Sequence, residues 1–228
     1  MKKALTLIIC GLLCICSIGQ LSAQQTNTSP EQFIYTFEYA KAKAETGDAK
    51  AETYLGFCYE NGLDVKKDYA EALKWFHKAV DQNYAEAQRN LGWCYYSGHG
   101  VQRDYAEAVK WFQKAADQNN LQAQCQLGDC YANGNGVPQD SVEAIKWYEK
   151  AANQNFVPAQ FYLSYCYKKG HLVKKNIVEY YKWESIELSH VNDPDDPIVL
   201  DQIAKQMTPD ELAQAQKEIS DFQASHKN

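Results

Sequence analysis

The sequence predicts an all-α fold, built as a solenoid of helix-turn-helix repeats. Four segments of 36 residues follow one another without insertion or deletion, and a fixed period of roughly 20–50 residues is the signature of a repeat array. Each segment holds two helical stretches separated by a glycine and a short loop. The period is visible in Trp75, Trp111, Trp147 and Trp183, and in Cys58, Cys94, Cys130 and Cys166.

The first 23 residues are predicted to be a secretory signal peptide. Two lysines precede an apolar run over residues 4–18, and the small residues Ser22 and Ala23 follow it. The apolar run is shorter than the roughly 20 residues that span a bilayer. We therefore expect cleavage after Ala23 and export of residues 24–228, to a bacterial periplasm or to the outside of the cell.

A lipoprotein anchor is the alternative to this cleavage. Cys14 and Cys16 are candidate anchor residues, but the bulky Leu13 and Ile15 stand directly before them, so we expect no anchor. No later stretch is apolar enough to cross a membrane. The mature chain is therefore predicted to be soluble.

The charge of the chain argues against a nucleic-acid partner. The formal net charge is −6, and it becomes −8 when residues 1–23 with their two lysines are removed. Nucleic-acid binding requires a basic face, and an acidic chain is equally unsuited to an anionic membrane.

The cysteines after the signal are expected to be mostly unpaired. They are Cys58, Cys94, Cys125, Cys130 and Cys166. Four share one repeat position, and equivalent points on stacked helices lie about 8–10 Å apart, whereas a disulfide needs Cα atoms within roughly 7 Å. Cys125 and Cys130 share a helix but point in different directions. We interpret all five as small core residues, because no CxxC spacing or histidine partner supports a metal or redox site.

An N-terminal capping helix is predicted within residues 24–47, ahead of the repeats. Ser29 is a suitable N-cap and Pro30 a suitable first-turn residue, and Gln32 stands at the capping-box position. The helix is therefore expected to run from about Pro30 to Thr46. Four full repeats follow at residues 48–83, 84–119, 120–155 and 156–191.

Each repeat carries the start and stop signals of two helices. In the second repeat the first helix is expected over Ala85 to Ser97, ending at Gly98 because glycine accepts the left-handed conformation. Asp104 then caps the second helix, with Glu107 in a capping-box pattern. The same pair recurs as Asp68/Glu71, Asp140/Glu143 and Asn176/Glu179, and the second helices are expected to end near Asn83, Asn119 and Asn155.

The tail, residues 192–228, breaks the period and is predicted to cap the array. A short helix is expected from about Ile198 to Gln206. Thr208 caps a second helix with Pro209 in its first turn, and its apolar stripe is Leu212, Ala215, Ile219 and Phe222. A solenoid needs such a cap because its last repeat would otherwise expose its core side.

The repeat unit resembles the Sel-1-like repeat family, which is similar to tetratricopeptide repeats. The pattern A-x-x-x-L-G-x-x-Y-x-x-G, a short loop, then D-Y-x-E-A-x-K-W-x-x-K-A recurs over about residues 48–191. The resemblance implies a right-handed α-solenoid that serves as a protein-interaction scaffold, with first helices lining a concave surface. The fourth unit departs most, with Ser164, Tyr180, Glu184 and Glu187, which suggests adaptation to the C-terminal cap.

Comparing the four units separates a fixed face of the first helix from a variable one. The positions of Ala87, Leu91, Cys94 and Tyr95 are nearly fixed, which predicts a packing core. The variable positions fit within a stripe of roughly 120° on a helical wheel, which we expect to face solvent or a partner. They are the positions of Glu86, Arg89, Asn90, Trp93, Tyr96 and Ser97.

The variable stripe is the predicted binding surface. It carries aromatic residues and an arginine, which binding hot spots favour, and an exposed apolar patch often marks a binding site. We expect a groove that binds an extended peptide or a partner helix through Phe57, Arg89, Trp93, Tyr96, Phe161 and Tyr165. Two alternatives stay open: the aromatics stack on an envelope polysaccharide such as peptidoglycan, or they pack on neighbouring repeats and caps.

No motif supports an enzyme. Some proteins of the resembled family have carried β-lactamase or penicillin-binding labels, but the S-x-x-K, S-D-N and K-T-G elements of that chemistry are absent here. We interpret Glu107 and Lys110 as a surface pair and Trp111 as a core residue, since all three recur in most units. No catalytic residue, cofactor or metal is expected, and a β-lactamase-like hydrolase is the last alternative.

Overall fold

The chain folds into helices that follow one another in pairs. The computed structural model describes residues 36–190 and 196–226, and within these residues it contains eleven α-helices and no strand. This confirms the predicted all-α fold. The predicted signal peptide lies outside the described residues. The chain forms two compact units, one up to residue 79 and one from residue 80 onward.

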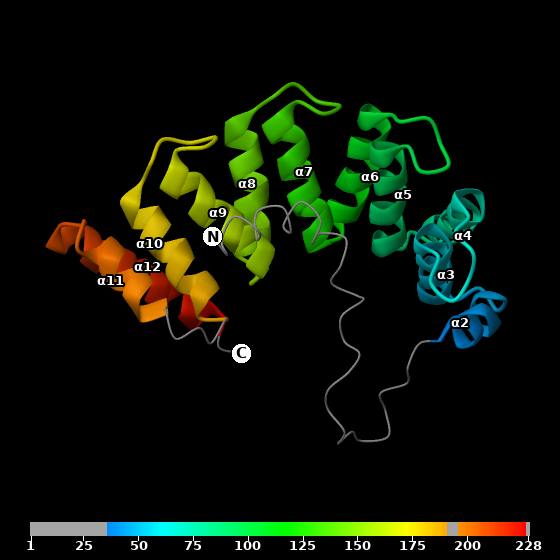
Figure 1. Cartoon of the computed structure of the whole chain (residues 1–228), viewed down its shortest axis with the longest axis horizontal. Helices are drawn as coiled ribbons and strands as arrows, with labels where there is room; N and C mark the ends of the chain where they lie inside the picture. Colours follow the sequence, from blue (N-terminus) through cyan, green and yellow to red (C-terminus); the bar gives the residue numbers. More distant parts are fainter. Residues whose placement is uncertain (1–35, 191–195, 227–228) are drawn as a thin grey trace, which may run out of the picture. The chain divides into compact units, whose positions relative to one another are not determined.

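Each repeat contributes one helix pair, α3/α4, α5/α6, α7/α8 and α9/α10 (Figure 1). Within the second unit, each pair packs side by side and also contacts the pair that follows it. The first unit holds α2 (Phe37–Ala44), α3 (Ala49–Asn61) and most of α4 (Tyr69–Asp81). The second holds α5 (Ala85–Ser97), α6 (Tyr105–Asp117), α7 (Leu121–Asn133), α8 (Ser141–Ala152), α9 (Val157–Lys169), α10 (Ile177–Leu188), α11 (Asp196–Ala204) and α12 (Pro209–Ser225).

The helix ends follow the predicted signals. Helix α5 spans the expected residues and ends at Gly98, whose φ of 76° is left-handed and whose N–H donates to the Cys94 carbonyl. Gly62, Gly134 and Gly170 end the other first helices in the same way. After the second helices, Asn83, Asn119 and Asn155 adopt left-handed φ angles of 58°, 62° and 65°. Both kinds of stop are thus confirmed.

The second helices start as predicted, with one difference. The Asp104 side chain accepts the N–H of Glu107 at 3.0 Å, and Asp68, Asp140 and Asn176 accept in the same way. However, Glu107 does not complete a capping box, because its carboxylate pairs with Lys110 at 2.8 Å instead. This confirms the predicted surface pair, whose attraction is weakened because solvent screens the exposed ammonium.

The N-terminal helix is shorter than predicted. Helix α2 begins at Phe37, and Thr36 before it is extended with φ −78° and ψ 157°. The Thr36 hydroxyl accepts the N–H of Tyr39 and so acts as the N-cap. A continuous helix from Pro30 to Thr46 is therefore wrong, and Ser29 and Pro30 lie outside the described residues.

A glycine-aromatic contact joins the two helices of each of the first three repeats. Gly92 on α5 lies against the ring of Phe112 on α6, so that a Cβ at residue 92 would come within 2.7 Å of two ring carbons. Gly56 meets Phe76 and Gly128 meets Tyr148 in the same way. In the fourth repeat the pair becomes Ser164 and Glu184, whose hydroxyl and carboxylate form a buried hydrogen bond.

The predicted core role of the cysteines is confirmed. Each of the five described cysteines carries a thiol rather than a disulfide and is at most 1% exposed. Burial raises the pKa of the Cys58 thiol to about 11 and that of Cys130 to about 12. The thiolate is therefore strongly disfavoured in the folded chain at neutral pH.

Trp111 is less buried than predicted. Trp183 is 2% exposed, but Trp111 is only half-buried. The Lys114 ammonium lies over its ring, 3.9 Å from the ring centroid. Trp147 packs against a core cluster formed by residues of the second and third repeats. The prediction that Trp111 is a core residue was therefore too strong.

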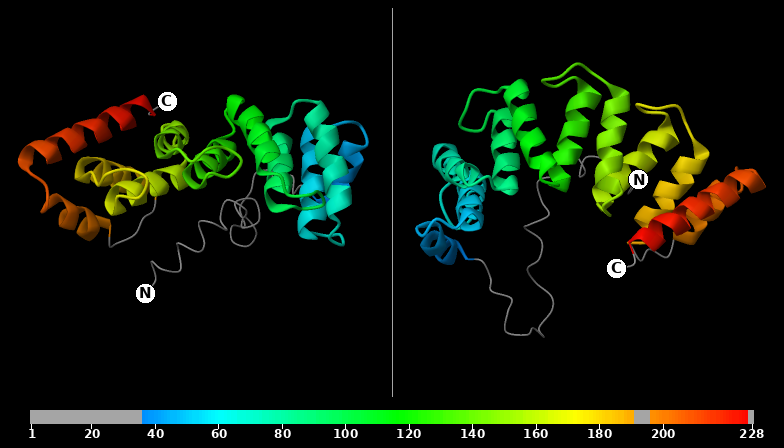
Figure 2. Two further views of the ribbon diagram at one scale, coloured as in Figure 1. Left: turned by 90° about the horizontal axis from the view of Figure 1, so that it is seen from above. Right: turned by 180° about the vertical axis from the view of Figure 1, so that it is seen from behind.

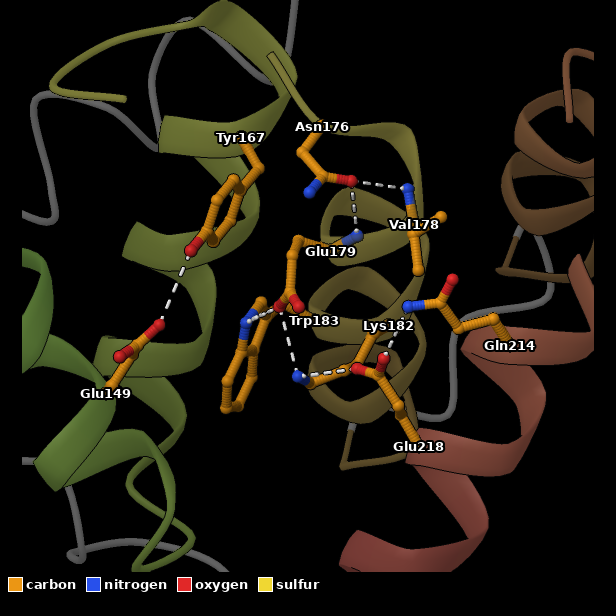
Figure 3. Close-up of polar contacts among 9 residues, drawn as sticks. All are labelled: Glu149, Tyr167, Asn176, Val178, Glu179, Lys182, Trp183, Gln214 and Glu218. Atoms are coloured by element: carbon orange, nitrogen blue, oxygen red, sulfur yellow. Dashed lines mark hydrogen bonds and ion pairs between the residues drawn. The ribbon is translucent and has the colours of Figure 1, made fainter. Parts of the chain in front are cut away.

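Two helices follow the last repeat. Helix α11 begins at Asp196, two residues before the predicted start, and α12 begins as expected, with a full capping box between Thr208 and Glu211. Helix α12 packs along α10 (Figure 2). The Lys182 ammonium pairs with Glu179 on its own helix and with Glu218 on α12, both at 3.0 Å (Figure 3). The ion pair between Lys182 and Glu218 thus joins the last repeat to α12.

Candidate interaction surface

The six predicted binding residues all lie on first helices, and all are partly buried. Phe57 is on α3 in the first unit. The others are on α5 and α9 in the second unit and are Arg89, Trp93, Tyr96, Phe161 and Tyr165.

An aromatic cluster surrounds Tyr96. Its ring stacks on Trp93 at a centroid distance of 5.5 Å and meets Tyr105 edge-on at 4.9 Å. Its hydroxyl accepts a hydrogen bond from the Asn135 side chain in the next repeat, at 2.9 Å. Burial raises the pKa of Tyr96. The cluster is therefore a rigid aromatic surface, held in place by contacts within one repeat and to the next.

Arg89 is held by neighbouring polar groups. Its side chain is 11% exposed, and its guanidinium pairs with Glu86 at 2.9 Å and donates to Asn90. Glu86 also accepts a hydrogen bond from Asn120 of the next repeat at 2.9 Å. The Arg89 charge is thus already paired with a carboxylate, and this group of side chains links two repeats.

The predicted variable stripe is only partly exposed. Asn90 is 4% exposed, and at the positions equivalent to Arg89, Thr53 is 5% and Cys125 is 1% exposed. Cys125 belongs to a core cluster with Leu163 of the next repeat. The expectation that the whole stripe faces solvent is therefore wrong, because a first helix packs on its own partner helix and also on the neighbouring repeat.

The third repeat carries a carboxylate in place of the half-buried aromatic residue. Asp129 stands at the position of Trp93, and its Oδ1 accepts the Tyr148 hydroxyl at 2.6 Å. Tyr148 stacks on Tyr162 at 5.2 Å with nearly parallel rings. Burial raises the pKa of Asp129 from 3.8 to about 6, although the Tyr148 hydrogen bond opposes the shift. The sequence does contain a signal for this pair, because the third repeat differs from the second at both positions. Tyr148 stands where the second repeat has Phe112, and Asp129 stands where it has Trp93.

Replacing Asp129 by asparagine is expected to stabilise the chain at neutral pH. Because folding raises the Asp129 pKa, its contribution to stability is fully present below about pH 4 and is lost as the pH rises through about 6. Asparagine still accepts the Tyr148 hydroxyl but carries no charge. We expect Asp129→Asn to raise the unfolding free energy by on the order of 1–2 kcal/mol near pH 7.5 and by little near pH 4.

Urea unfolding at the two pH values measures this difference. Asp221→Asn, at an exposed position of α12, is the matched control and should change little at either pH. An equal effect of Asp129→Asn at both pH values would contradict the raised pKa.

No metal site or membrane span is found in the described part of the chain. No group of three or more histidine, cysteine or acidic side chains there could hold a metal ion. None of the helices α2 to α12 is long and apolar enough to cross a membrane.

Two curated proteins share part of the repeat array. The chain is 38% identical over 78 residues to the secretory immunoglobulin A-binding protein EsiB of Escherichia coli O6:H1, which covers 34% of this chain and 14% of that protein. It is 44% identical over 46 residues to the Sel1-like repeat-containing protein L18 of Acanthamoeba polyphaga mimivirus, which covers 20% of this chain and 8% of that protein. The matches thus span only a small part of either relative.

Solved structures show the same architecture. One is c5321, a protective antigen present in uropathogenic Escherichia coli strains displaying an SLR fold, with a TM-score of 0.63 and 39% identity over 69% of this chain and 34% of that chain. Another is a Sel1 repeat protein from Oxalobacter formigenes, with a TM-score of 0.62 and 33% identity over 68% of this chain and 62% of that chain. The predicted repeat solenoid is therefore confirmed.

The family assignment follows from the repeats themselves. The family model described as Sel1 repeat matches residues 49–84, 85–120, 121–156 and 157–183, more than half of the chain. Sel1 repeats generally mediate protein–protein interactions, and the family is generally a non-catalytic scaffold. With four consecutive matches, the chain belongs to the Sel1 repeat family.

Proposed function

We propose that this chain is a non-enzymatic scaffold of a bacterial cell envelope, which binds a protein or peptide segment in a concave groove along its first helices. The binding residues are Phe57, Arg89, Trp93, Tyr96, Phe161 and Tyr165. The proposal places the mature chain outside the cytoplasm, in agreement with the signal-like first 23 residues.

The main support is the contrast between fixed and variable positions of the first helices. Leu91 and Cys94 are buried and recur in the repeats, whereas the position of Trp93 is half-buried and changes from one repeat to the next. Packing alone does not require an aromatic side chain at a variable, solvent-accessible position. Partly exposed aromatic residues on rigid helices lose little conformational entropy when they bind.

The relatives agree with a protein partner. EsiB is named for binding secretory immunoglobulin A, and it shares 38% identity with this chain over 78 residues. Because the match covers only 14% of that protein, the partner of the present chain has to be found by experiment.

A pull-down from solubilised envelope tests the proposal. The bait is residues 24–228, compared with the triple variant Phe57→Ala/Trp93→Ala/Tyr165→Ala. We expect one or more proteins to be retained by the unmodified bait and reduced at least about tenfold with the variant, since truncation of a hot-spot residue typically costs more than 1 kcal/mol. Mass spectrometry identifies the retained protein, and circular dichroism checks that helicity is unchanged.

The matched control changes equivalent positions on the second helices. Lys74, Lys110 and Lys146 are each more than 60% exposed, and their triple alanine variant should retain the partner. Equal retention by both variants would place the site on another face. Retention of glycan alone would favour an envelope polysaccharide as the ligand.

A further inference from the structure

The loop of the fourth repeat differs in charge from the equivalent loops. Residues 167–176 of the fourth repeat, which are the last turn of α9 and the loop that follows it and are called the fourth loop below, contain four lysines and no carboxylate. The equivalent segments 59–68, 95–104 and 131–140 each contain at least as many carboxylates as lysines and arginines. The difference is specific to one repeat of an acidic chain, so the shared repeat fold does not account for it.

The lysines of this loop have no acidic partner among the described residues. On the second helices, Lys74, Lys110, Lys146 and Lys182 each pair with a glutamate three residues earlier, at 2.8–3.0 Å. In the fourth loop, the Lys168 ammonium lies 4.8 Å from the centre of the Tyr180 ring, and no described carboxylate pairs with any of the four lysines. All four are exposed, and they are Lys168, Lys169, Lys174 and Lys175.

The loss of acidic residues includes the helix cap. Asp104 and Asp140 cap α6 and α8, but Asn176 caps α10. Asn176 accepts the backbone N–H groups of Val178 and Glu179 at 3.0 and 3.2 Å (Figure 3). The cap is therefore retained while a negative charge that favours a helix N-terminus is given up. Asparagine in place of aspartate does not stabilise the fold here. The loss of the negative charge would, however, favour the binding of an anionic ligand.

The basic loop continues the aromatic face of α9. Phe161, Tyr165 and Lys168 are spaced four and three residues apart, so they lie on one face of the helix. Tyr165 also meets the ring of His171, in the loop, edge-on at 6.2 Å. A segment that follows α9 would therefore contact aromatic rings first and ammonium groups next.

We propose that α9 and the loop at 167–176 bind an acidic protein segment, in which an aromatic or apolar residue lies beside a run of carboxylates. This inference rests on the proposed function and names the chemistry of the partner. Charge complementarity supports it, because four exposed ammonium groups without acidic partners attract carboxylates. A peptide fits better than a nucleic acid, whose affinity depends on many phosphate contacts across a wide basic face.

Selection of displayed peptides on the mature chain tests this inference. The library contains random peptides of about twelve residues, which in extended form are longer than α9. Peptides selected on the chain should carry an acidic run next to an aromatic or apolar residue. For the best peptide, Kd is then measured by fluorescence anisotropy, and it should rise with salt because exposed charges are screened.

Two variants with the same change in charge make the test specific. Lys174→Glu/Lys175→Glu alters the fourth loop, and Lys66→Glu/Lys67→Glu alters the equivalent positions of the first loop, which are also exposed lysines. We expect the first variant to raise Kd at least about tenfold and the second to change it by less than about threefold.

The outcomes separate this inference from the proposed function. Selected peptides without acidic residues, or an equal loss in both variants, would overturn the acidic partner and leave the groove intact. Failure to select any peptide would count against both proposals. Anionic phospholipid vesicles that bind the unmodified chain but not Lys174→Glu/Lys175→Glu, without selection of acidic peptides, would assign the loop to a membrane instead.

Discussion

Replacing Phe112 by alanine is expected to destabilise the second unit by about 3–5 kcal/mol, the range observed when a large aromatic side chain is removed from a core. The Phe112 side chain is 0% exposed and belongs to the central cluster of its repeat. Its ring fills the space left by Gly92. Urea unfolding followed by far-UV circular dichroism measures the loss, and Val142→Ala, at a side chain 64% exposed on α8, should change stability by less than about 0.5 kcal/mol.

The contact between Gly92 and Phe112 allows a second test of the same packing. Alanine normally favours a helix over glycine by about 1 kcal/mol, but a Cβ at residue 92 would lie 2.7 Å from two carbons of Phe112. We therefore expect Gly92→Ala to cost about 1–3 kcal/mol with Phe112 present. With Phe112→Leu in the same chain the cost should fall, because leucine has no ring edge there. Additive effects of the two changes would contradict the close packing of this pair.

Placing a charge at Ile219 is expected to have the second large effect. Ile219 is 9% exposed on the side of α12 that packs on α10, and Phe222 on the same side meets Trp183 edge-on at 6.1 Å. An aspartate at residue 219 would bring an unpaired carboxylate into this contact. We expect Ile219→Asp to cost on the order of 2–4 kcal/mol.

The neighbouring residue provides the control for the charge itself. Ser220 is exposed on α12, so Ser220→Asp adds the same charge outside the contact and should cost less than about 0.5 kcal/mol. Urea unfolding measures the stability of both variants. If both variants were equally stable, the proposed role of residues 192–228 as a cap for the last repeat would fail.

The fold could be predicted because its rules are local and are repeated four times. Gly98 and Asn119 end helices by adopting left-handed angles, and Asp104 starts one by accepting a backbone N–H. Each signal acts within a few residues, so a single sequence reveals it. The start of α2 was mispredicted because Thr36, which caps it, competes with an equally good signal at Ser29 and Pro30.

The candidate surface was harder to predict because it depends on contacts between repeats. A helical wheel distinguishes inside from outside for a helix that packs on one side. Cys125 packs against residues of the next repeat, and Arg89 is held by Glu86, which in turn binds Asn120 one repeat later. Such contacts join residues more than thirty positions apart, and the wheel of one helix contains no information about them.

The buried cysteines give each repeat its own internal reporter of local opening. Cys58, Cys94, Cys130 and Cys166 occupy the same position in the four repeats and are at most 1% exposed. A thiol reagent can reach such a side chain only when the surrounding helices separate, and each modified cysteine identifies the repeat that opened. In an oxidising environment the same geometry means that the folded array shields its thiols, so that lasting oxidation would mark a repeat that has come apart.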